Sequence, residues 1–131
     1  MPERLRVGVI GCGLIAQVMH LHYLRELADR FEITALCDVS EGLARACAKD
    51  YGVPRIFTRW QDLLTGPVDA VLILTSGSHA PIAMAAAKAG KHMLIEKPMC
   101  FSVAEGRAMI TAAERAKVTL MVGYNNRYDP A

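Results

Sequence analysis

Short apolar runs alternate with longer segments of helical periodicity along the whole chain. The strand-sized runs cover residues 5–10, 32–37, 55–57, 70–75, 93–96 and 119–123. Helices are expected between them, over residues 14–29, 41–51, 61–64, 81–89 and 103–117. This alternation is typical of β-α-β units with a buried parallel sheet. Because such crossovers are right-handed, the sequence predicts an α/β fold with a doubly wound, mostly parallel sheet of strand order 3-2-1-4-5-6.

Several of the expected helices carry recognisable ends. Ser102 followed three residues later by Glu105 forms the pattern of a capping box, which satisfies free backbone N–H groups in the first turn. Pro81 suits a first helical turn, and Gly90 suits the left-handed position just past a helix end. The whole chain, residues 1–131, is therefore expected to form one domain.

Charge and cysteine usage narrow the class of partner. Fifteen Lys and Arg side chains stand against thirteen Asp and Glu, a formal net charge of +2 with no basic cluster. Nucleic acid is therefore not expected as a partner, and no apolar run is long enough to span a membrane. The four cysteines form no C-x-x-C pair, which favours a reducing, cytoplasmic location.

A glycine-rich turn follows the first predicted strand directly. The run Gly11-Cys12-Gly13-Leu14-Ile15-Ala16 is a G-x-G-x-x-A pattern between a strand and a helix. Gly11 permits a tight turn, Gly13 lets the backbone approach a pyrophosphate, and Ala16 lets the helix pack close to the strand. The pyrophosphate is expected on the free N–H groups of the helix start, with Leu14 and Ile15 beside it. The pattern predicts a Rossmann-type dinucleotide site.

Asp38 ends the second predicted strand. An acid there accepts hydrogen bonds from the ribose hydroxyls of the adenosine and repels a 2′-phosphate, so the sequence favours NAD over NADP. The alternative is that Asp38 caps or turns the chain before the helix that begins at Glu41. Arg45, one helical turn further on, is interpreted as a solvated helix residue rather than a phosphate ligand.

Glu96-Lys97-Pro98 follows the fifth predicted strand. A lysine at that position can hydrogen-bond a substrate hydroxyl and stabilise a developing alkoxide while hydride leaves the carbon. An isolated lysine at a strand end is, however, more often a solvated surface group.

Four segments together resemble the N-terminal domain of the Gfo/Idh/MocA oxidoreductases, the family of glucose-fructose oxidoreductase and inositol dehydrogenase. They are the stretches at residues 7–13, 37–38, 89–98 and 122–128, of which the Ala-Gly-Lys-His to Glu-Lys-Pro stretch is highly specific. The resemblance covers essentially all 131 residues.

The resemblance implies roles for individual residues. Lys97 corresponds to the family's catalytic lysine, and the glycine turn and Asp38 correspond to its cofactor ligands. Further cofactor contacts are implied by the matching positions, which are Thr75, Ser76, His79, Glu96, Asn125 and Arg127, and by Lys97 itself. The loop from Leu74 to His79 is one residue shorter than in many members, so for His79 a role as a plain helix-entry residue is an equal alternative. The family pattern also implies a cis bond before Pro98.

The resemblance further implies hydride transfer between a nicotinamide cofactor and a sugar, cyclitol or related polyol. Family enzymes continue for about 150 to 250 residues into a mostly β substrate domain, which this chain lacks, so the isolated chain is expected to be catalytically incomplete. A non-enzymatic dinucleotide sensor or scaffold is the main alternative, and an inert fragment is a third. A homo-oligomer is compatible with all three.

Two other patterns have ordinary interpretations. His20 and His22 resemble a metal pair, but residues two apart on a helix point away from each other, so no metal site is expected. Cys12 in the glycine turn is a reactive thiol only if it is exposed at the helix start, and it is interpreted here as a small space-filling residue.

Overall fold

The computed structural model describes residues 3–130. Its strands are β1 (Leu5–Ile10), β2 (Phe31–Cys37), β3 (Arg55–Phe57), β4 (Ala70–Ile73), β5 (His92–Ile95) and β6 (Leu120–Val122). Its α-helices are α1 (Leu21–Glu26), α2 (Glu41–Tyr51), α3 (Trp60–Leu64), α4 (Ala80–Lys88) and α5 (Val103–Ala116). A π-helical segment, η1 (Ala16–His20), precedes α1, and a 3₁₀ segment, η2 (Asn125–Tyr128), follows β6.

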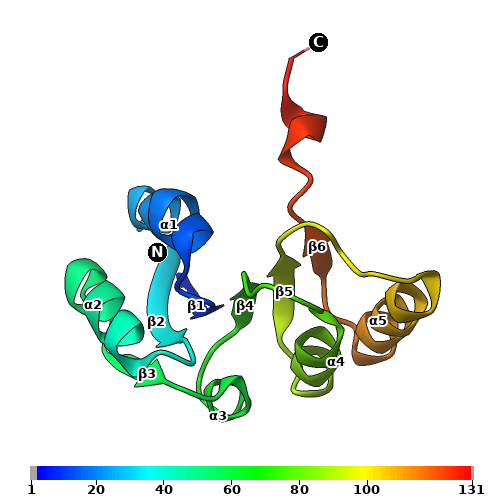
Figure 1. The fold of residues 1–131 in the computed structure, drawn as a ribbon, viewed down its shortest axis with the longest axis horizontal. Helices are drawn as coiled ribbons and strands as arrows, with labels where there is room; N and C mark the ends of the chain where they lie inside the picture. Colours follow the sequence, from blue (N-terminus) through cyan, green and yellow to red (C-terminus); the bar gives the residue numbers. More distant parts are fainter. Residues whose placement is uncertain (1–2, 131) are drawn as a thin grey trace.

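The strands form one six-stranded sheet in the order β3-β2-β1-β4-β5-β6, with every neighbouring pair parallel. The predicted strand order and fold class are therefore confirmed. The sheet is strongly twisted, and the segment after β6 projects away from it (Figure 1). The order of the strands changes direction between β1 and β4: the chain builds the sheet outward from β1 to β3 on one side, and from β4 to β6 on the other. A crevice therefore opens between the carboxyl ends of these two central, parallel strands.

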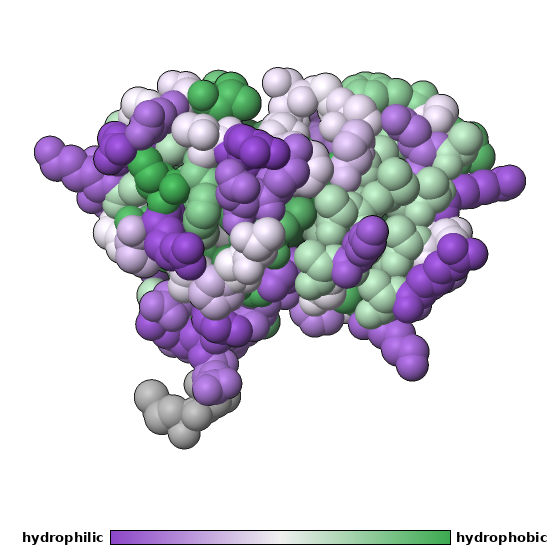
Figure 2. Space-filling model, turned by 90° about the horizontal axis from the view of Figure 1, so that it is seen from below, coloured by the Kyte–Doolittle hydropathy of each residue, from purple (hydrophilic) through white to green (hydrophobic). Residues whose placement is uncertain are grey.

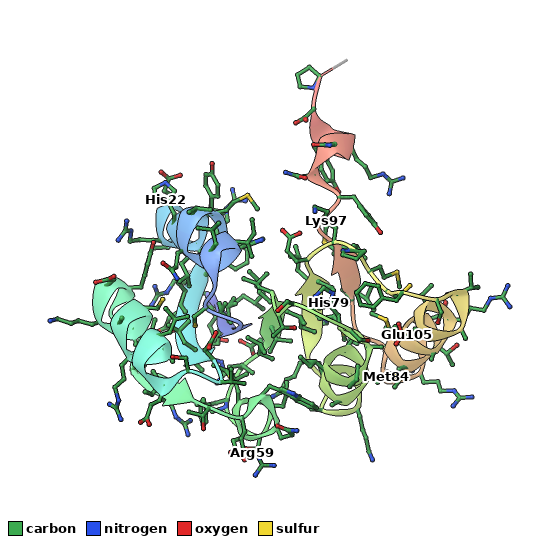
Figure 3. All side chains as sticks on the ribbon, viewed as in Figure 1. His22, Arg59, His79, Met84, Lys97 and Glu105 are labelled. Carbon is green, nitrogen blue, oxygen red and sulfur yellow. The ribbon has the colours of Figure 1, made fainter. Side chains whose placement is uncertain are left out.

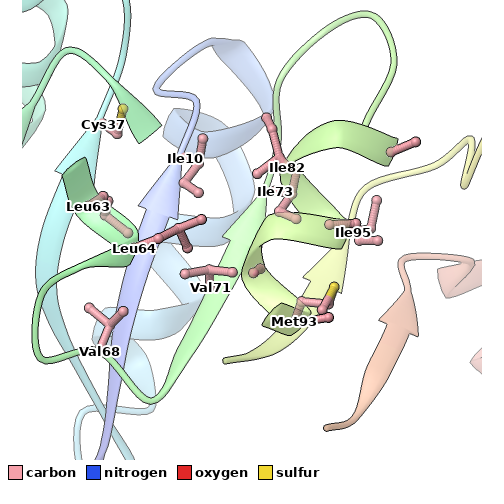
Figure 4. Close-up of a cluster of buried hydrophobic side chains, with 14 of the residues drawn as sticks. Ile10, Cys37, Leu63, Leu64, Val68, Val71, Ile73, Ile82, Met93 and Ile95 are labelled. Atoms are coloured by element: carbon pink, nitrogen blue, oxygen red, sulfur yellow. The ribbon is translucent and has the colours of Figure 1, made fainter. Parts of the chain in front are cut away.

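Each face of the sheet is covered by its own helices and its own core. Apolar residues of α3, α4 and α5 pack on one face in a cluster that includes Ile10, Ile73 and Ile95 (Figure 4). The other face holds a second cluster, in which Val7 and Val9 of β1 meet residues of α1 and α2. Because side chains alternate along a strand, β1 contributes to both clusters and is nearly solvent-free over its last four residues.

The first helix departs from the prediction. One uninterrupted helix was expected over residues 14–29, but residues 16–20 form a π-helical turn and α1 ends at Glu26. Leu27 leaves the helical region with ψ of 30°. A π turn inserts one extra residue into the helical register, so side chains beyond it are rotated from the faces that 3.6-residue periodicity predicts.

The predicted helix ends are confirmed with one change. Gly90 has φ of 76°, and the Ser102 hydroxyl accepts from the Glu105 N–H at 3.1 Å. The reciprocal half of the capping box is different, because the Glu105 carboxylate accepts from the N–H of Phe101 (3.1 Å) and the hydroxyl of Ser78 (3.0 Å). Glu105 therefore joins the start of α5 to the loop before α4.

Seen from below, pale green side chains of moderate hydropathy spread over the side of the molecule that carries α4 and α5 (Figure 2). Met84 on α4 and Ile110 on α5 are among the exposed large apolar side chains. Within residues 3–130, no helix has the length and apolar character needed to cross a membrane.

Candidate functional site

A cavity of about 570 Å³ lies at the carboxyl ends of the central strands. It is bounded by the glycine turn, the end of β2, the loop after β3, and the loop between β4 and α4. Its lining includes Gly11, Gly13, Leu14, Ile15, Asp38, Thr58, Trp60, Thr75 and Ser76. The site residues predicted from the glycine motif are thus gathered around one space, apart from Ala16, which is fully buried under the turn.

Glycine occupies the two positions of the turn for different structural reasons. Gly11 has φ of +102°, and a Cβ there would lie 2.9 Å from the main-chain carbon of Leu74 on the neighbouring strand end. Its N–H donates to the Cys37 carbonyl at 2.8 Å, which fixes the turn against β2. Gly13 is different, because a Cβ there would have no heavy atom within 4 Å. Gly11 is therefore required by the fold, whereas Gly13 leaves open space at the cavity wall.

Asp38 lies directly against the glycine turn and holds it by a hydrogen bond. Its Oδ2 accepts from the N–H of Cys12 at 2.9 Å, and its Oδ1 accepts from the N–H of Ser40 at 2.9 Å. Ser40, not Asp38, caps α2, since its hydroxyl accepts from the Leu43 N–H at 3.3 Å. Each carboxylate oxygen can accept further bonds, so Asp38 shapes the turn while it still faces the cavity.

The surroundings of Asp38 carry no cation directed at the cavity in the described part of the chain. Val39 is 93% exposed, and the Arg45 guanidinium lies 2.6 Å from the Glu41 carboxylate on the same helix. Arg45 is thus engaged along the exposed surface of α2, as expected for a solvated helix residue.

Cys12 is a packing residue within the turn. Its side chain is fully buried, and its thiol faces the Cys37 carbonyl at 3.7 Å. Burial, followed by the negative charge that Cys47 and Asp38 place nearby, raises the pKa of the Cys12 thiol to about 12. The thiol therefore stays protonated and unreactive near neutral pH, which agrees with its interpretation as a space-filling residue.

A smaller cavity of about 380 Å³ lies beyond the ends of β4 and β5. It is lined by Ile15, Met19, Leu74, Thr75, Ser76, Glu96, Lys97 and Asn125. Ile15 and the Leu74 to Ser76 segment line both cavities, so the two are neighbouring parts of one crevice. Figure 3 shows Lys97 just past the end of β5, where the chain after β6 leaves the sheet.

Thr75 stands at the junction of the two cavities. Its hydroxyl oxygen is buried and has no hydrogen-bond partner among residues 3–130. A buried hydroxyl without a partner is costly, and a ligand in the crevice is one source of the missing bond. Arg127, by contrast, is exposed on η2 and lines neither cavity, while its neighbour Asn125 lines the smaller one.

His79 occupies an internal position rather than the cavity wall. It is 3% exposed and is the N-cap residue of α4. Its Nε2 lies 2.6 Å from the Thr75 carbonyl and its Nδ1 lies 3.1 Å from the Pro98 carbonyl. His79 thus joins the loop after β4 to the loop after β5, in keeping with the helix-entry alternative. The Lys97-Pro98 bond is cis, as the resemblance implied.

One pair at the crevice was not foreseen from the sequence. His20 Nε2 lies 3.1 Å from Glu96 Oε1, with side-chain exposures of 14% and 13%. His22 points elsewhere and pairs with Glu26 on the exposed side of α1. The two histidines therefore do not share a ligand, and no group of three possible metal ligands occurs within the described part of the chain. His20 ends the π-helical segment, and its partner Glu96 lies 76 residues away in the sequence.

The crevice fits a dinucleotide. One cavity has an open glycine turn and an acid, the other has a lysine, and an unpartnered hydroxyl lies where they meet. The family model described as "Oxidoreductase family, NAD-binding Rossmann fold" (GFO_IDH_MocA) matches residues 5–124. The chain belongs to this family.

Curated relatives and solved structures agree with the family match. The chain is 37% identical over 131 residues to D-apiose dehydrogenase of Paraburkholderia graminis, and 35% identical over 127 residues to myo-inositol 2-dehydrogenase of Thermotoga maritima. These alignments cover 98% and 95% of this chain but only 34% and 37% of the relatives. The WlbA dehydrogenase of Bordetella pertussis, solved with NADH and UDP-GlcNAcA, superposes with a TM-score of 0.91 at 33% identity. That alignment covers 97% of this chain and 39% of the WlbA chain, so the chain spans just over a third of these proteins.

Proposed function

We propose that this chain is the cofactor-binding part of a nicotinamide-dependent dehydrogenase that acts on a sugar, cyclitol or related polyol. The observation that carries the proposal is the crevice itself. A dinucleotide turn and an acid lie at one end, and a lysine lies at the other, in cavities that share the Leu74 to Ser76 segment.

Residues at different positions along the crevice have different roles. Gly11 and Gly13 let the main chain approach a pyrophosphate, and the carboxylate of Asp38 faces the place of the adenosine ribose. NAD, when bound, supplies the nicotinamide carbon that accepts or returns hydride. Lys97 donates a hydrogen bond to the reacting hydroxyl and stabilises the alkoxide that develops as hydride leaves.

The substrate class rests on the relatives. D-apiose dehydrogenase and myo-inositol 2-dehydrogenase are named for a sugar and a cyclitol. Both relatives are nearly three times as long as the matched segment, and no residue of this chain is assigned to the recognition of a particular substrate. A small-molecule partner, a cytoplasmic location and a possible homo-oligomer complete the proposal, and neither nucleic acid nor a membrane is invoked.

Lys97 favours an enzyme over a dinucleotide sensor. A module that only binds the cofactor has little use for a cation beside the nicotinamide end, whereas alkoxide stabilisation requires one.

Calorimetric titration of the chain with NADH and NADPH tests the proposal. Saturable binding of NADH, with weaker binding of NADPH, is the expected result, because the Asp38 carboxylate repels a 2′-phosphate. If the chain bound neither NADH nor NADPH, the proposed function would be wrong.

A further inference from the structure

Glu96 is held in place by three parts of the fold. Its Oε1 meets His20 Nε2 at 3.1 Å, and its Oε2 accepts from the main-chain N–H of Lys97 at 2.8 Å. A Cβ on Gly123 would lie 3.3 Å from Oε2, so this glycine leaves room for the carboxylate beside β6. The carboxylate is therefore fixed between the first helix, the end of β5 and the end of β6.

The pair is largely withdrawn from water. The His20 and Glu96 side chains are 14% and 13% exposed, whereas the His22 and Glu26 side chains are 45% and 58% exposed at the same 3.1 Å separation. Hydrogen bonds to a charged group gain strength as solvent is excluded, so the His20 pair constrains its residues more than the His22 pair does.

The pair also connects the two ends of the crevice. His20 ends the π turn that begins at Ala16, directly after the glycine turn. Glu96 lines the smaller cavity and immediately precedes Lys97. Two hydrogen bonds, both made by the Glu96 carboxylate, therefore link the π segment after the glycine turn to the main chain of Lys97.

We infer that His20 and Glu96 are positioning residues, which orient Lys97 at the nicotinamide end of the crevice by holding its main chain. Lys97 itself remains the catalytic residue, since neither member of the pair needs to touch substrate. This inference rests on the proposed function for its purpose, but the anchoring of Lys97 is a property of the chain alone.

The test compares NADH with ADP-ribose, which lacks the nicotinamide. His20→Leu removes the hydrogen bond to Glu96, and we expect it to weaken NADH binding about tenfold while ADP-ribose binding is unchanged. His20→Gln retains an N–H that can reach Glu96 and is expected to restore NADH binding to within about twofold. His22→Leu, which breaks the exposed pair on the same helix, is the matched control and should change neither affinity.

Hydrogen exchange at the Lys97 amide gives a second readout that needs no ligand. In His20→Leu this amide should exchange about tenfold faster than in the wild type, and in His20→Gln it should return toward the wild-type rate. Equal loss of both ligands in His20→Leu, no loss of either, or failure of His20→Gln to restore NADH binding would overturn the inference. A wild-type chain that binds neither ligand would refute the proposed function, and the Lys97 exchange rates would still decide the anchoring.

Discussion

The main-chain N–H of Cys12 donates a 2.9 Å hydrogen bond to Oδ2 of Asp38, so the glycine turn and the end of β2 are joined at the wall of the larger cavity. Asp38 therefore has two roles, one toward the fold and one toward a ribose. Both depend on its oxygens.

Substitution of Asp38 tests its role in dinucleotide binding. Asp38→Ala removes every acceptor and is expected to lower NADH affinity about tenfold or more. Asp38→Asn retains one acceptor oxygen and removes the charge. It should therefore lose less NADH affinity than Asp38→Ala does, and its preference for NADH over NADPH should be smaller than that of the wild type. Calorimetry with both dinucleotides measures the effect, with Asp29→Ala, whose side chain is 77% exposed, as the control. An unchanged affinity in Asp38→Ala would remove this residue from the site.

Alanine substitutions at the two glycines of the turn should have different effects. Gly11→Ala places a methyl group 2.9 Å from Leu74 at φ of +102°, and is expected to lower the free energy of unfolding by about 3 kcal/mol. Gly13→Ala meets no heavy atom within 4 Å, so stability should be preserved while the methyl group obstructs a pyrophosphate. Urea unfolding and NADH titration of both variants distinguish them. Loss of stability in Gly13→Ala with intact NADH binding would reverse this assignment.

Asp69 provides an acid-sensitive contact at the amino ends of the central strands, opposite the crevice. The Arg6 side chain and N–H, each donating to this carboxylate at 2.8 Å, lower the pKa of Asp69 to about 2 from an ordinary value near 3.8. Because the pKa is depressed in the folded state, the stabilisation is complete above about pH 4 and is lost as the pH falls toward 2. Asp69→Asn should therefore lower the Tm by about 2 °C at pH 7, since the pair is partly exposed. In thermal melts from pH 7 to pH 2, the Tm values of the wild type and Asp69→Asn should converge. A Tm difference that stays constant with pH would contradict the assignment.

Thiol labelling reports on the core. Burial raises the pKa of Cys37 to about 11 and that of Cys12 to about 12, and Cys47 is also buried. Cys100, which is partly exposed, is expected to react with a disulfide reagent first in the native protein. We expect one thiol of the native protein to be labelled rapidly, and this rapid labelling to be lost in Cys100→Ser. The other three thiols should be labelled only after unfolding. Fast labelling of Cys12 would contradict its interpretation as a packing residue.

The sequence predicted those parts of the molecule that depend on local patterns. Strand order follows from the alternation of elements and from crossover handedness, and Gly11, Gly13 and Asp38 follow from a short motif in a β-α unit. His20 was missed because its partner, Glu96, lies 76 residues away in the sequence. The hydrogen bonds of His79 depend on where two loops pack together, and no periodicity describes such loops. The carboxylate of Glu105 was assigned to its own helix end, but tertiary packing also brought the hydroxyl of Ser78 to it.

The last prediction is that these 131 residues bind NADH but do not oxidise polyols. Oxidation of an alcohol requires a base for the hydroxyl proton, and general acid-base help is typically worth about 10²- to 10⁴-fold. Within the described residues that line the smaller cavity, the ionisable side chains are Glu96 and Lys97. An ammonium on Lys97 stabilises an alkoxide but cannot accept a proton, and Glu96 is assigned to holding Lys97 through its main-chain N–H.

Incubation of the purified chain with NAD⁺ and a panel of inositols and aldoses, followed at the absorbance of NADH, measures this directly. A parallel NADH titration ensures that an inactive sample is still competent to bind. We expect no turnover above the uncatalysed rate in either the wild type or Lys97→Ala. Robust turnover by the wild type that Lys97→Ala abolishes would show that Lys97 serves as the base and that the chain is catalytically sufficient.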